Sequence, residues 1–508
     1  MREAAGIGSA LALILLLPRI VRFFYPEVWI EDDFYLESAY LVAAGMRPYV
    51  DFVHVHFPVL EWIAAAYIKL FGASLASLEF ANEAAIYATS LLVFALGRRV
   101  AGRPVAIASA ILYGFASLVF RYHLWERECF VAPIVAGAAI VVLDDGPASM
   151  RGVLAVAGLL AMACAIKLTA AVPAVVIVGY IAIFQRRLLS AGAIAAALAM
   201  ALAALTAFCY WRYGFDFVFQ TFFFHFMKGR DTNAIIALYP AAILDVFAPL
   251  FILGIIRCCG RDALGPAGIL VLAMAAAEYA FFGLASPTAW GHNYLEALPF
   301  IAIIAGIGAI AAIDALRNLI TSETPARADW MWAVGGGLFI LISLMSITPL
   351  VNENWLRDSV YGFGFVPRGE IAQIADAVRR ASGPGDSIVA PSFVCYAANR
   401  IELIRYPELY GVYREARAEY EREGFFAARR HLGDQDFFGL IADTAHFWTD
   451  QIRTSVTDRK VKIVISDSPL QLLPLVLVPS QMLADSGYRP ILRTAHYTVW
   501  DLEAPPSR

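Results

Sequence analysis

The sequence has little charge for its length. Only 16% of its 508 residues are charged, 60% are hydrophobic, and the mean hydropathy is +0.65. Soluble domains are about a quarter charged and about half apolar, so a wholly soluble protein is not expected. The charge is also uneven, because 38 of the 82 charged residues lie in residues 351–508. The chain therefore divides near residue 350 into a lipid-embedded part, 1–350, and a water-soluble part, 351–508.

Several motifs are also missing. No run of Lys and Arg resembles a nucleic-acid-binding patch, and with a net charge of −4 no nucleic-acid partner is expected. The six cysteines show no metal-binding spacing. There is no nucleotide-binding loop, dinucleotide-binding fingerprint or Gly-x-Ser-x-Gly nucleophile turn. An enzyme with this sequence would therefore receive its activated group already attached to a substrate.

What is present is a series of apolar runs. A membrane span needs about 20 mostly apolar residues, and about eleven candidate spans can be marked. They are 5–24, 80–97, 104–120, 129–143, 151–166, 168–184, 188–209, 240–256, 264–284, 297–316 and 331–349. The first is predicted to be a retained span and not a signal peptide, because Glu3 precedes its apolar run Ile7–Leu17 and Pro18-Arg19 follows that run in place of a small-residue cleavage site. The predicted fold class is an all-α polytopic membrane domain followed by a C-terminal α/β domain.

The segment Phe57–Phe71 decides the orientation. It is only about 15 residues long and contains Glu61 and Lys69, which favours an interfacial helix over a twelfth span. If this segment is an interfacial helix, every short connection between spans on the cytoplasmic side contains an arginine, as the positive-inside rule expects. The internal arginines are Arg98, Arg99, Arg103, Arg151, Arg186, Arg187, Arg257, Arg261, Arg317 and Arg327. The N-terminus is then cytoplasmic. The first external loop, 25–79, and the 351–508 domain are extracytoplasmic, as expected for a protein of a bacterial inner (plasma) membrane.

The soluble part has an α/β pattern. Two apolar, β-rich runs, Asp386–Ala390 and Val461–Ser466, predict buried strands, and Tyr488–Trp500 predicts a terminal strand or hairpin. The runs Arg368–Ala381 and Tyr413–His431 predict helices. Strands alternating with helices and no catalytic motif predict an accessory or substrate-binding domain.

The first external loop opens with three consecutive carboxylates, Glu31, Asp32 and Asp33. One interpretation is structural, with Asp32 or Asp33 capping a loop helix that runs to Ala44. The other is functional, because clustered carboxylates raise one another's pKa, which suits a general base. Hard cations also bind carboxylate oxygens, so the sequence leaves open whether a divalent cation binds here.

The order of motifs after these carboxylates resembles the GT-C glycosyltransferases, which use polyprenyl-phosphate sugars. It is similar above all to the protein O-mannosyltransferases and the lipid A aminoarabinose transferases. Those enzymes carry an Asp-Glu pair, a turn with Gly, Pro or Tyr and Asp, and a Lys- or His-Pro-Pro-Leu segment. The matching motifs here are Asp32-Asp33, the turn Gly45-Met46-Arg47-Pro48-Tyr49-Val50-Asp51, and His56-Phe57-Pro58-Val59. The resemblance implies a GT-C membrane fold and a lipid-linked sugar donor.

The resemblance also implies roles for single residues. Asp32 would be the general base, with Asp33 as a second catalytic carboxylate. The candidates for binding the donor phosphate are Arg121, Arg127, Lys167 and His292, and those for binding an acceptor or a metal are Glu126, Glu128, His54 and His56. Structural alternatives remain open: the 121–128 loop could be an exposed turn whose charges satisfy one another, and Lys167 could reach the membrane interface.

The predicted function is inverting transfer of a sugar from a polyprenyl-phosphate carrier to the hydroxyl of a glycan, lipid or protein acceptor, outside the membrane. Two other activities also fit many spans with intramembrane charge: a transporter or flippase for a lipid-linked saccharide, and an oligosaccharide ligase that uses a pyrophosphate carrier. A transporter usually shows internal repeats, and none is seen here. A non-catalytic scaffold is the remaining alternative.

Overall fold

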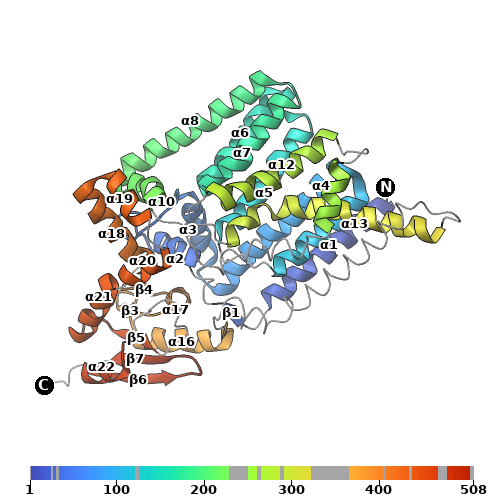
Figure 1. Cartoon of the computed structure of the whole chain (residues 1–508). Helices are drawn as coiled ribbons and strands as arrows, with labels where there is room; N and C mark the ends of the chain where they lie inside the picture. Colours follow the sequence, from blue (N-terminus) through green and yellow to red (C-terminus); the bar gives the residue numbers. More distant parts are fainter. Residues whose placement is uncertain are drawn as a thin grey trace.

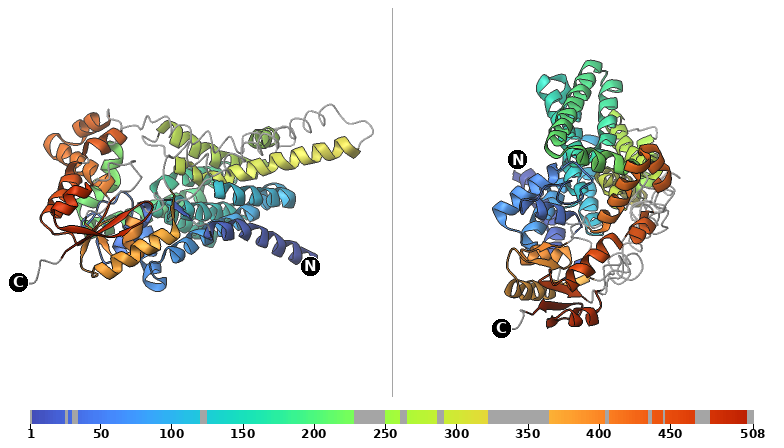
Figure 2. Two further views of the ribbon diagram at one scale, coloured as in Figure 1. Left: turned by 90° about the horizontal axis from the view of Figure 1, so that it is seen from below. Right: turned by 90° about the vertical axis from the view of Figure 1, so that its left-hand side faces the viewer.

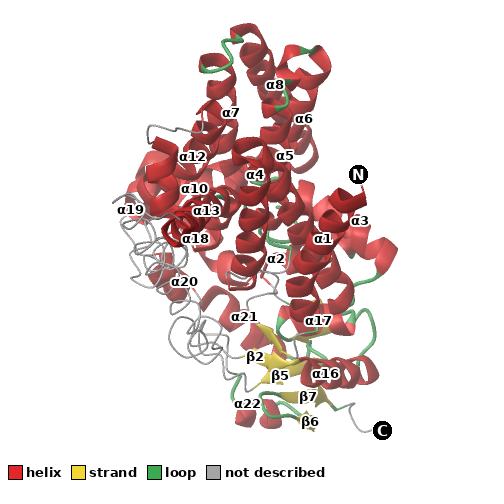
Figure 3. Cartoon of the chain, turned by 90° about the vertical axis from the view of Figure 1, so that its right-hand side faces the viewer, coloured by secondary structure: helices red, strands yellow, loops and turns green. Residues whose placement is uncertain are grey.

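The computed structural model describes residues 2–24, 27–29, 34–119, 125–227, 250–259, 265–285, 291–321, 365–403, 407–433, 437–444, 446–466 and 478–503. Most of these residues are helical (Figure 1). The described strands gather at one end of the molecule, beside the C-terminus (Figure 3).

Apolar helices make up the described parts of residues 1–350. The longer ones are α1 (Arg2–Phe23), α2 (Phe34–Ala43), α3 (Val59–Phe71), α4 (Leu75–Val119), α5 (Arg127–Leu143), α6 (Met150–Ile166), α7 (Ala171–Ile183), α8 (Leu188–Tyr213), α12 (Gly265–Ala280) and α13 (Leu298–Thr321). Short elements between them include η3 (Leu168–Ala170), α9 (Phe215–Val218), the π-helical turn η4 (Phe219–Phe223), α10 (Phe224–Met227) and the 3₁₀ helix η6 (Gly291–Glu296).

Within the described ranges, four segments are long and apolar enough to cross a membrane. They are Leu75–Gly114, Leu188–Tyr213, Gly265–Leu284 and Leu298–Asn318, and the shorter apolar helices are Leu11–Ile20, Met150–Ile166, Leu168–Ile183 and Leu250–Cys259. These are the helices of a multi-pass membrane protein, but the predicted number of spans is not confirmed. The predicted span 331–349 and most of 240–256 lie outside the described residues.

Helix α4 consists of two helices joined at a kink. Ala101 and Gly102 leave the helical conformation there, and Gly102 has a φ of +82°. Glycine adopts this region without the steric cost that a side chain brings. Pro104 follows in the first turn of the second half, where its missing N–H is not needed. The two halves correspond to the predicted spans 80–97 and 104–120.

Helix α13 lies in the core of the membrane domain. Its residues 300–305 are all 0% exposed. It packs closely on the second half of α4, because a Cβ atom at Gly306 would lie only 2.2 Å from Ser109 Oγ. Small residues allow such close helix packing inside membranes. By contrast, α8 buries only Ala191, Ile194 and Cys209, and runs along one edge of the bundle (Figure 1).

The 351–508 part contains helices around one small sheet. Its helices are α16 (Arg368–Ala381), α17 (Ser392–Ala398), α18 (Pro407–Glu423), α19 (Phe425–Gly433), α20 (Phe437–Thr444), α21 (His446–Thr457) and α22 (Ser480–Asp485). The sheet has the order β4-β3-β5-β7-β6. Its strands are β3 (Ser387–Val389), β4 (Ile401–Glu402), β5 (Ile463–Ser466), β6 (Tyr488–Arg493) and β7 (Thr498–Leu502).

The predicted strands and hairpin of this part are confirmed as β3, β5 and the antiparallel pair β6–β7. Strand β3 pairs in parallel with β4 and with β5. The predicted single helix Tyr413–His431 is wrong in one respect. Gly424, with a φ of +81°, ends α18 and separates it from α19.

The C-terminal part of the chain is joined to the segment 25–79, which is predicted to be the first external loop, by a second, two-stranded sheet. Strand β1 (Glu27–Trp29) pairs antiparallel with β2 (Phe365–Pro367), with Val28 opposite Val366. The left view of Figure 2 shows this domain at one end of the helical bundle, with the far ends of α1 and α13 pointing away from it. The segments 25–79 and 351–508 therefore meet on the same side of the molecule.

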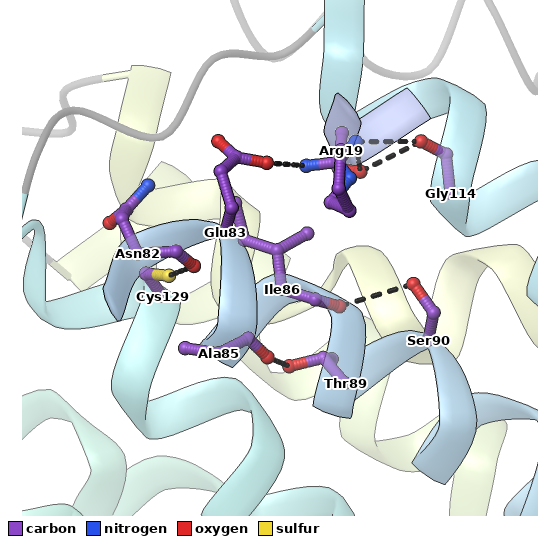
Figure 4. Close-up of polar contacts among 10 residues, drawn as sticks. Arg19, Asn82, Glu83, Ala85, Ile86, Thr89, Ser90, Gly114 and Cys129 are labelled. Atoms are coloured by element: carbon purple, nitrogen blue, oxygen red, sulfur yellow. Dashed lines mark hydrogen bonds and ion pairs between the residues drawn. The ribbon is translucent and has the colours of Figure 1, made fainter. Parts of the chain in front are cut away.

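A buried ion pair fixes α1 to both halves of α4. Arg19, only 3% exposed, donates from Nη1 to Glu83 Oε2 at 2.9 Å, and from Nη2 to the Gly114 carbonyl at 3.0 Å and to Ser117 Oγ at 2.9 Å (Figure 4). Next to Glu83, the carbonyl of Asn82 accepts a hydrogen bond from the Cys129 thiol at 3.5 Å. This guanidinium is therefore a bridge between three helical segments.

Replacing Arg19 by Met removes the guanidinium that forms this ion pair with Glu83 and keeps an unbranched side chain. Losing one member of a buried ion pair typically costs about 3–5 kcal/mol, so thermal unfolding of the purified protein should shift to a clearly lower temperature. The double variant Arg19→Met/Glu83→Gln leaves no uncompensated charge and should recover part of this loss. A double variant less stable than the single one would contradict the role given to the pair.

Candidate functional site

The structure describes only some of the residues predicted for the site. Asp32, Asp33 and Arg121 lie outside the described residues. His292 lies in η6, but its side chain is outside the described part. The other predicted residues are described, and four of them, His54, Arg127, Glu128 and Lys167, fall into two neighbouring buried clusters, while Glu126 is buried directly before α5. The first joins His54, Glu61 and Arg127, and the second joins Glu128 and Lys167 to residues of η6.

In the first cluster, Glu61 is bound from two sides. Arg127, at the start of α5, donates from Nη2 to Glu61 Oε1, and His54 Nε2 lies 3.3 Å from Glu61 Oε2. All three side chains are at most 3% exposed. Arg127 and Glu61 lie 66 residues apart in the sequence, so the pair ties α3 to the N-terminus of α5. Arg127 therefore pairs with a residue outside the 121–128 loop. The exposed-turn interpretation had assumed that the charges of this loop satisfy one another.

The surroundings of Glu61 keep its carboxylate ionised. Burial on its own raises the pKa of Glu61, but the charges of Arg127 and His54, together with hydrogen bonds, outweigh that effect and lower the pKa to about 2. A buried carboxylate with a guanidinium and an imidazole beside it is a fixed negative charge at neutral pH. It is suited to orienting Arg127 and His54, and not to accepting a proton.

In the second cluster, Lys167 is the central residue. It ends α6 and precedes η3, and its Nζ donates to Glu128 Oε1, lies 2.7 Å from Glu296 Oε1 and donates to Asn293 Oδ1 at 3.0 Å. Its side chain is 6% exposed. Thr169 Oγ1 also donates to Glu296 at 3.3 Å. Lys167 is therefore buried among polar and charged partners inside the protein.

A third carboxylate lies close to this cluster. Glu278, on α12, is 1% exposed and interacts electrostatically with Glu296 and Lys167. Its Oε2 has no hydrogen-bond partner among the described residues. One lysine thus has three glutamates near it, and burying that many negative charges is unfavourable unless protons or other cations share the site.

His56 lies where the two clusters meet. Its half-buried ring is 6.4 Å from that of His54 and 5.5 Å from that of His225, between ring centroids. Enclosure by the loop lowers the pKa of His56 well below its usual value, and the positive charges of Arg127 and Lys167 lower it further. His56 is therefore neutral at pH 7, and its ring can donate or accept a hydrogen bond.

The turn before His54 is held by a glutamine from η4. Gln220 accepts a hydrogen bond from the His54 amide at 2.8 Å and donates to the Tyr49 carbonyl at 3.0 Å. Tyr49 has a φ of +67°, and its hydroxyl donates to the His56 carbonyl. The predicted Gly45–Asp51 turn is therefore a tight, internally bonded loop, and Gln220 fixes it from outside.

Sequence reasoning missed Glu61, Gln220, Glu278 and Glu296 as site residues. The signal that could have identified the two glutamates at 61 and 278 is a lone carboxylate in an apolar helix, which is costly in a membrane and therefore functional by default. Across the described ranges, no three His, Cys, Asp or Glu side chains are placed to hold a metal ion. The contacts within the two clusters are ion pairs and hydrogen bonds.

The fold matches solved structures. No protein-family model matches the sequence, and no curated protein matches it. ArnT from Cupriavidus metallidurans, bound to undecaprenyl phosphate, is similar with a TM-score of 0.61 and 14% identity over 98% of both chains. The apo Archaeoglobus fulgidus oligosaccharyltransferase gives a TM-score of 0.50 and 11% identity, over 90% of this chain and 69% of that one.

Both of these structures belong to the GT-C superfamily. The chain therefore has the GT-C fold, which confirms what the motif order of the first external loop predicted. The likeness extends through the C-terminal domain, because 98% of the chain is covered.

The low pKa of Glu61 predicts how stability changes with pH. Its contribution is fully present above the ordinary glutamate pKa of 4.5 and is lost as the pH falls toward about 2. The difference in melting temperature between wild type and Glu61→Gln should therefore be largest near pH 7 and shrink between pH 4.5 and 3. A difference that stays constant over this range would mean that the ionised form of Glu61 is not what stabilises the cluster.

Proposed function

We propose that this protein is a membrane glycosyltransferase that moves a sugar from a polyprenyl-phosphate carrier to an acceptor hydroxyl, with inversion at the anomeric carbon. The observation that supports this most is the GT-C fold over almost the whole chain, shared with a protein that binds undecaprenyl phosphate. The buried cations Arg127 and Lys167, next to the first external loop, supply charge of the sign that a phosphate requires.

In the proposed mechanism Asp32 is the general base. It removes the proton from the acceptor hydroxyl as the acceptor oxygen attacks the anomeric carbon, while Asp33 is the second carboxylate of the pair. The carbon–oxygen bond to the lipid phosphate breaks, and the phosphate leaves with the electron pair. That group is already charged and stable in water, so its departure does not depend on an acid.

The leaving phosphate is stabilised by positive charge that is already in place. We assign Arg127 and Lys167 to this task, with Arg121 and His292 as further candidates. Glu61 holds Arg127 in a fixed position, and Glu128 and Glu296 together hold Lys167. Preorganised charge of this kind stabilises a transition state without the cost of reorganising solvent. A guanidinium also carries five N–H donors, and a single carboxylate does not accept hydrogen bonds from all five of them.

The remaining candidates are assigned to the acceptor. His56 and His54 lie on the first external loop, and Glu126 directly precedes α5. The neutral ring of His56 suits a hydrogen bond to a sugar or acceptor hydroxyl. Whether a divalent cation joins Asp32 and Asp33 is tested by assaying transfer with and without EDTA.

The reaction is proposed to take place outside the inner membrane, with the N-terminus in the cytoplasm. The pairing of β1 with β2 supports this, because it places the first loop and the C-terminal domain on one side of the molecule. The length of α3, 13 residues, supports the interfacial placement that the orientation depends on.

An oligosaccharide ligase with a pyrophosphate carrier is the second candidate, because the fold is also similar to that of an oligosaccharyltransferase. Purified protein in vesicles can be given either a labelled polyprenyl-phosphate monosaccharide or a labelled polyprenyl-pyrophosphate oligosaccharide. The proposed function requires transfer and lipid phosphate release with the first donor. Transfer with the second donor alone would establish the ligase, and movement of either donor across the bilayer without transfer would establish a flippase.

Replacing Asp32 by Asn tests the proposed base. Loss of a general base typically costs 10²–10⁴-fold in rate, so sugar transfer should fall by about that factor while membrane insertion stays normal. A control is Asp458→Asn, because Asp458 is an exposed aspartate of the C-terminal domain that pairs with the exposed Lys460. Near wild-type transfer by Asp32→Asn would remove Asp32 from the mechanism.

A further inference from the structure

The C-terminal domain holds the first external loop just before its acidic triplet. In the pairing of β1 with β2, Glu27, Val28 and Trp29 lie opposite Pro367, Val366 and Phe365. Asp32 comes only three residues after Trp29 in the sequence. Because a chain advances at most about 3.3–3.6 Å per residue, the stretch of chain that joins β1 to Asp32 is short.

The same domain also holds the loop just after the triplet. Helix α2 begins at Phe34, next to Asp33, and packs on α17. The Tyr40 hydroxyl donates to Asn399 Oδ1 at 3.2 Å, and the Tyr40 ring meets the Tyr396 ring edge-on with centroids 5.7 Å apart. The triplet is therefore flanked on both sides by segments that rest on the C-terminal domain.

One ion pair fixes this arrangement to the membrane domain. Arg368 is the first residue of α16 and follows Pro367, the last residue of β2. Its Nη1 donates to Glu79 Oε2 at 2.6 Å and its Nη2 donates to Glu79 Oε1, so the contact is bidentate. Glu79 is 4% exposed and lies in the first turns of α4. A two-bond guanidinium–carboxylate contact fixes orientation as well as distance.

We propose that Arg368 is a positioning residue for the transfer reaction. The ion pair of Arg368 with Glu79 fixes β2 against α4. Strand β2 in turn fixes β1, and β1 sets the position from which the acidic triplet begins. This inference rests on the proposed function, in which Asp32 accepts a proton. Catalysis by a base is sensitive to such placement, because a shift of about 1 Å can cost about 100-fold in rate.

The kinetic test uses Arg368→Met in the full-length protein, with a labelled polyprenyl-phosphate monosaccharide as donor. We expect kcat to fall about 10- to 100-fold, while KM for the donor changes by less than about twofold. The reason is that Arg127 and Lys167, assigned to the donor phosphate, lie on α5 and at the end of α6. A lower kcat with an almost unchanged KM is expected when a substitution removes an interaction that acts only in the transition state.

Three further variants separate positioning from general destabilisation. Arg368→Lys keeps the charge but not the two-bond geometry, and should give an intermediate kcat. The charge swap Glu79→Arg/Arg368→Glu restores the pair and should recover at least part of kcat. Arg380→Met is the matched control, because Arg380 is an exposed arginine on the same helix, and its kcat should be that of wild type.

Hydrogen exchange gives a readout that does not need activity. In Arg368→Met, backbone amides of residues 27–29 and 34–43 should exchange faster than in wild type, and those of α13 should not. Absence of sugar transfer in wild type would refute the proposed function. The hydrogen-exchange rates of residues 27–29 and 34–43 would still test whether Arg368 holds the loop in place. Unchanged exchange in these segments, or a rise in KM with kcat unchanged, would overturn the positioning role. If Arg368→Met does not fold, the charge swap decides: recovery of transfer supports the role, and a folded but slow swap refutes it.

Discussion

The buried pair of Glu61 and Arg127 is the interaction from which the geometry of the site follows. Neither charge could stay ionised alone in an apolar domain, because an unpaired buried charge costs several kcal/mol. The pair therefore brings α3 against the N-terminus of α5 across 66 residues of sequence. Because His54 binds the other oxygen of Glu61, the same carboxylate also anchors the loop that carries His56.

The second cluster follows from the first. Glu128 is the neighbour of Arg127 in the sequence and, like it, lies in the first turn of α5. Once Arg127 is fixed by Glu61, Glu128 is placed to meet Lys167 at the end of α6, and Lys167 in turn meets Glu296 of η6. Residues that share partners in this way do not act independently, so substitutions among them should not be additive. The site behaves as one electrostatic unit built from four elements.

The sequence predicted the fold where local pattern and chemistry agree. The order of the Gly45–Asp51 turn, the His56–Val59 segment and α3 was enough to predict the GT-C fold, because those motifs follow one another over a short stretch. The helix Arg368–Ala381 was predicted with its observed bounds, since its apolar residues repeat with helical spacing. The break at Gly424 was missed, because a single glycine does not show from sequence alone that it has a positive φ.

The partners within the site could not be predicted in the same way. Arg127 and Lys167 were predicted as candidates for binding the donor phosphate, but sequence does not show which carboxylate lies beside each one. Lys167 meets Asn293 across 126 residues and Gln220 reaches Tyr49 across 171. Such contacts depend on how the helices pack, and only the three-dimensional structure contains that information.

The composition boundary near residue 350 is not a boundary in packing. Phe219 and Phe224 on the membrane side are at most 2% exposed because they share one apolar cluster with Val412, Ala416, Ala428 and Leu432 of α18 and α19. The same cluster includes Val53 of the first loop, which lies next to His54. The C-terminal domain thus covers aromatic side chains that would otherwise be exposed and supports the loop that carries the site. A change in charge density along a sequence therefore does not mark a break in packing, and the loop that is proposed to carry out the chemistry is stabilised by residues from both sides of that change.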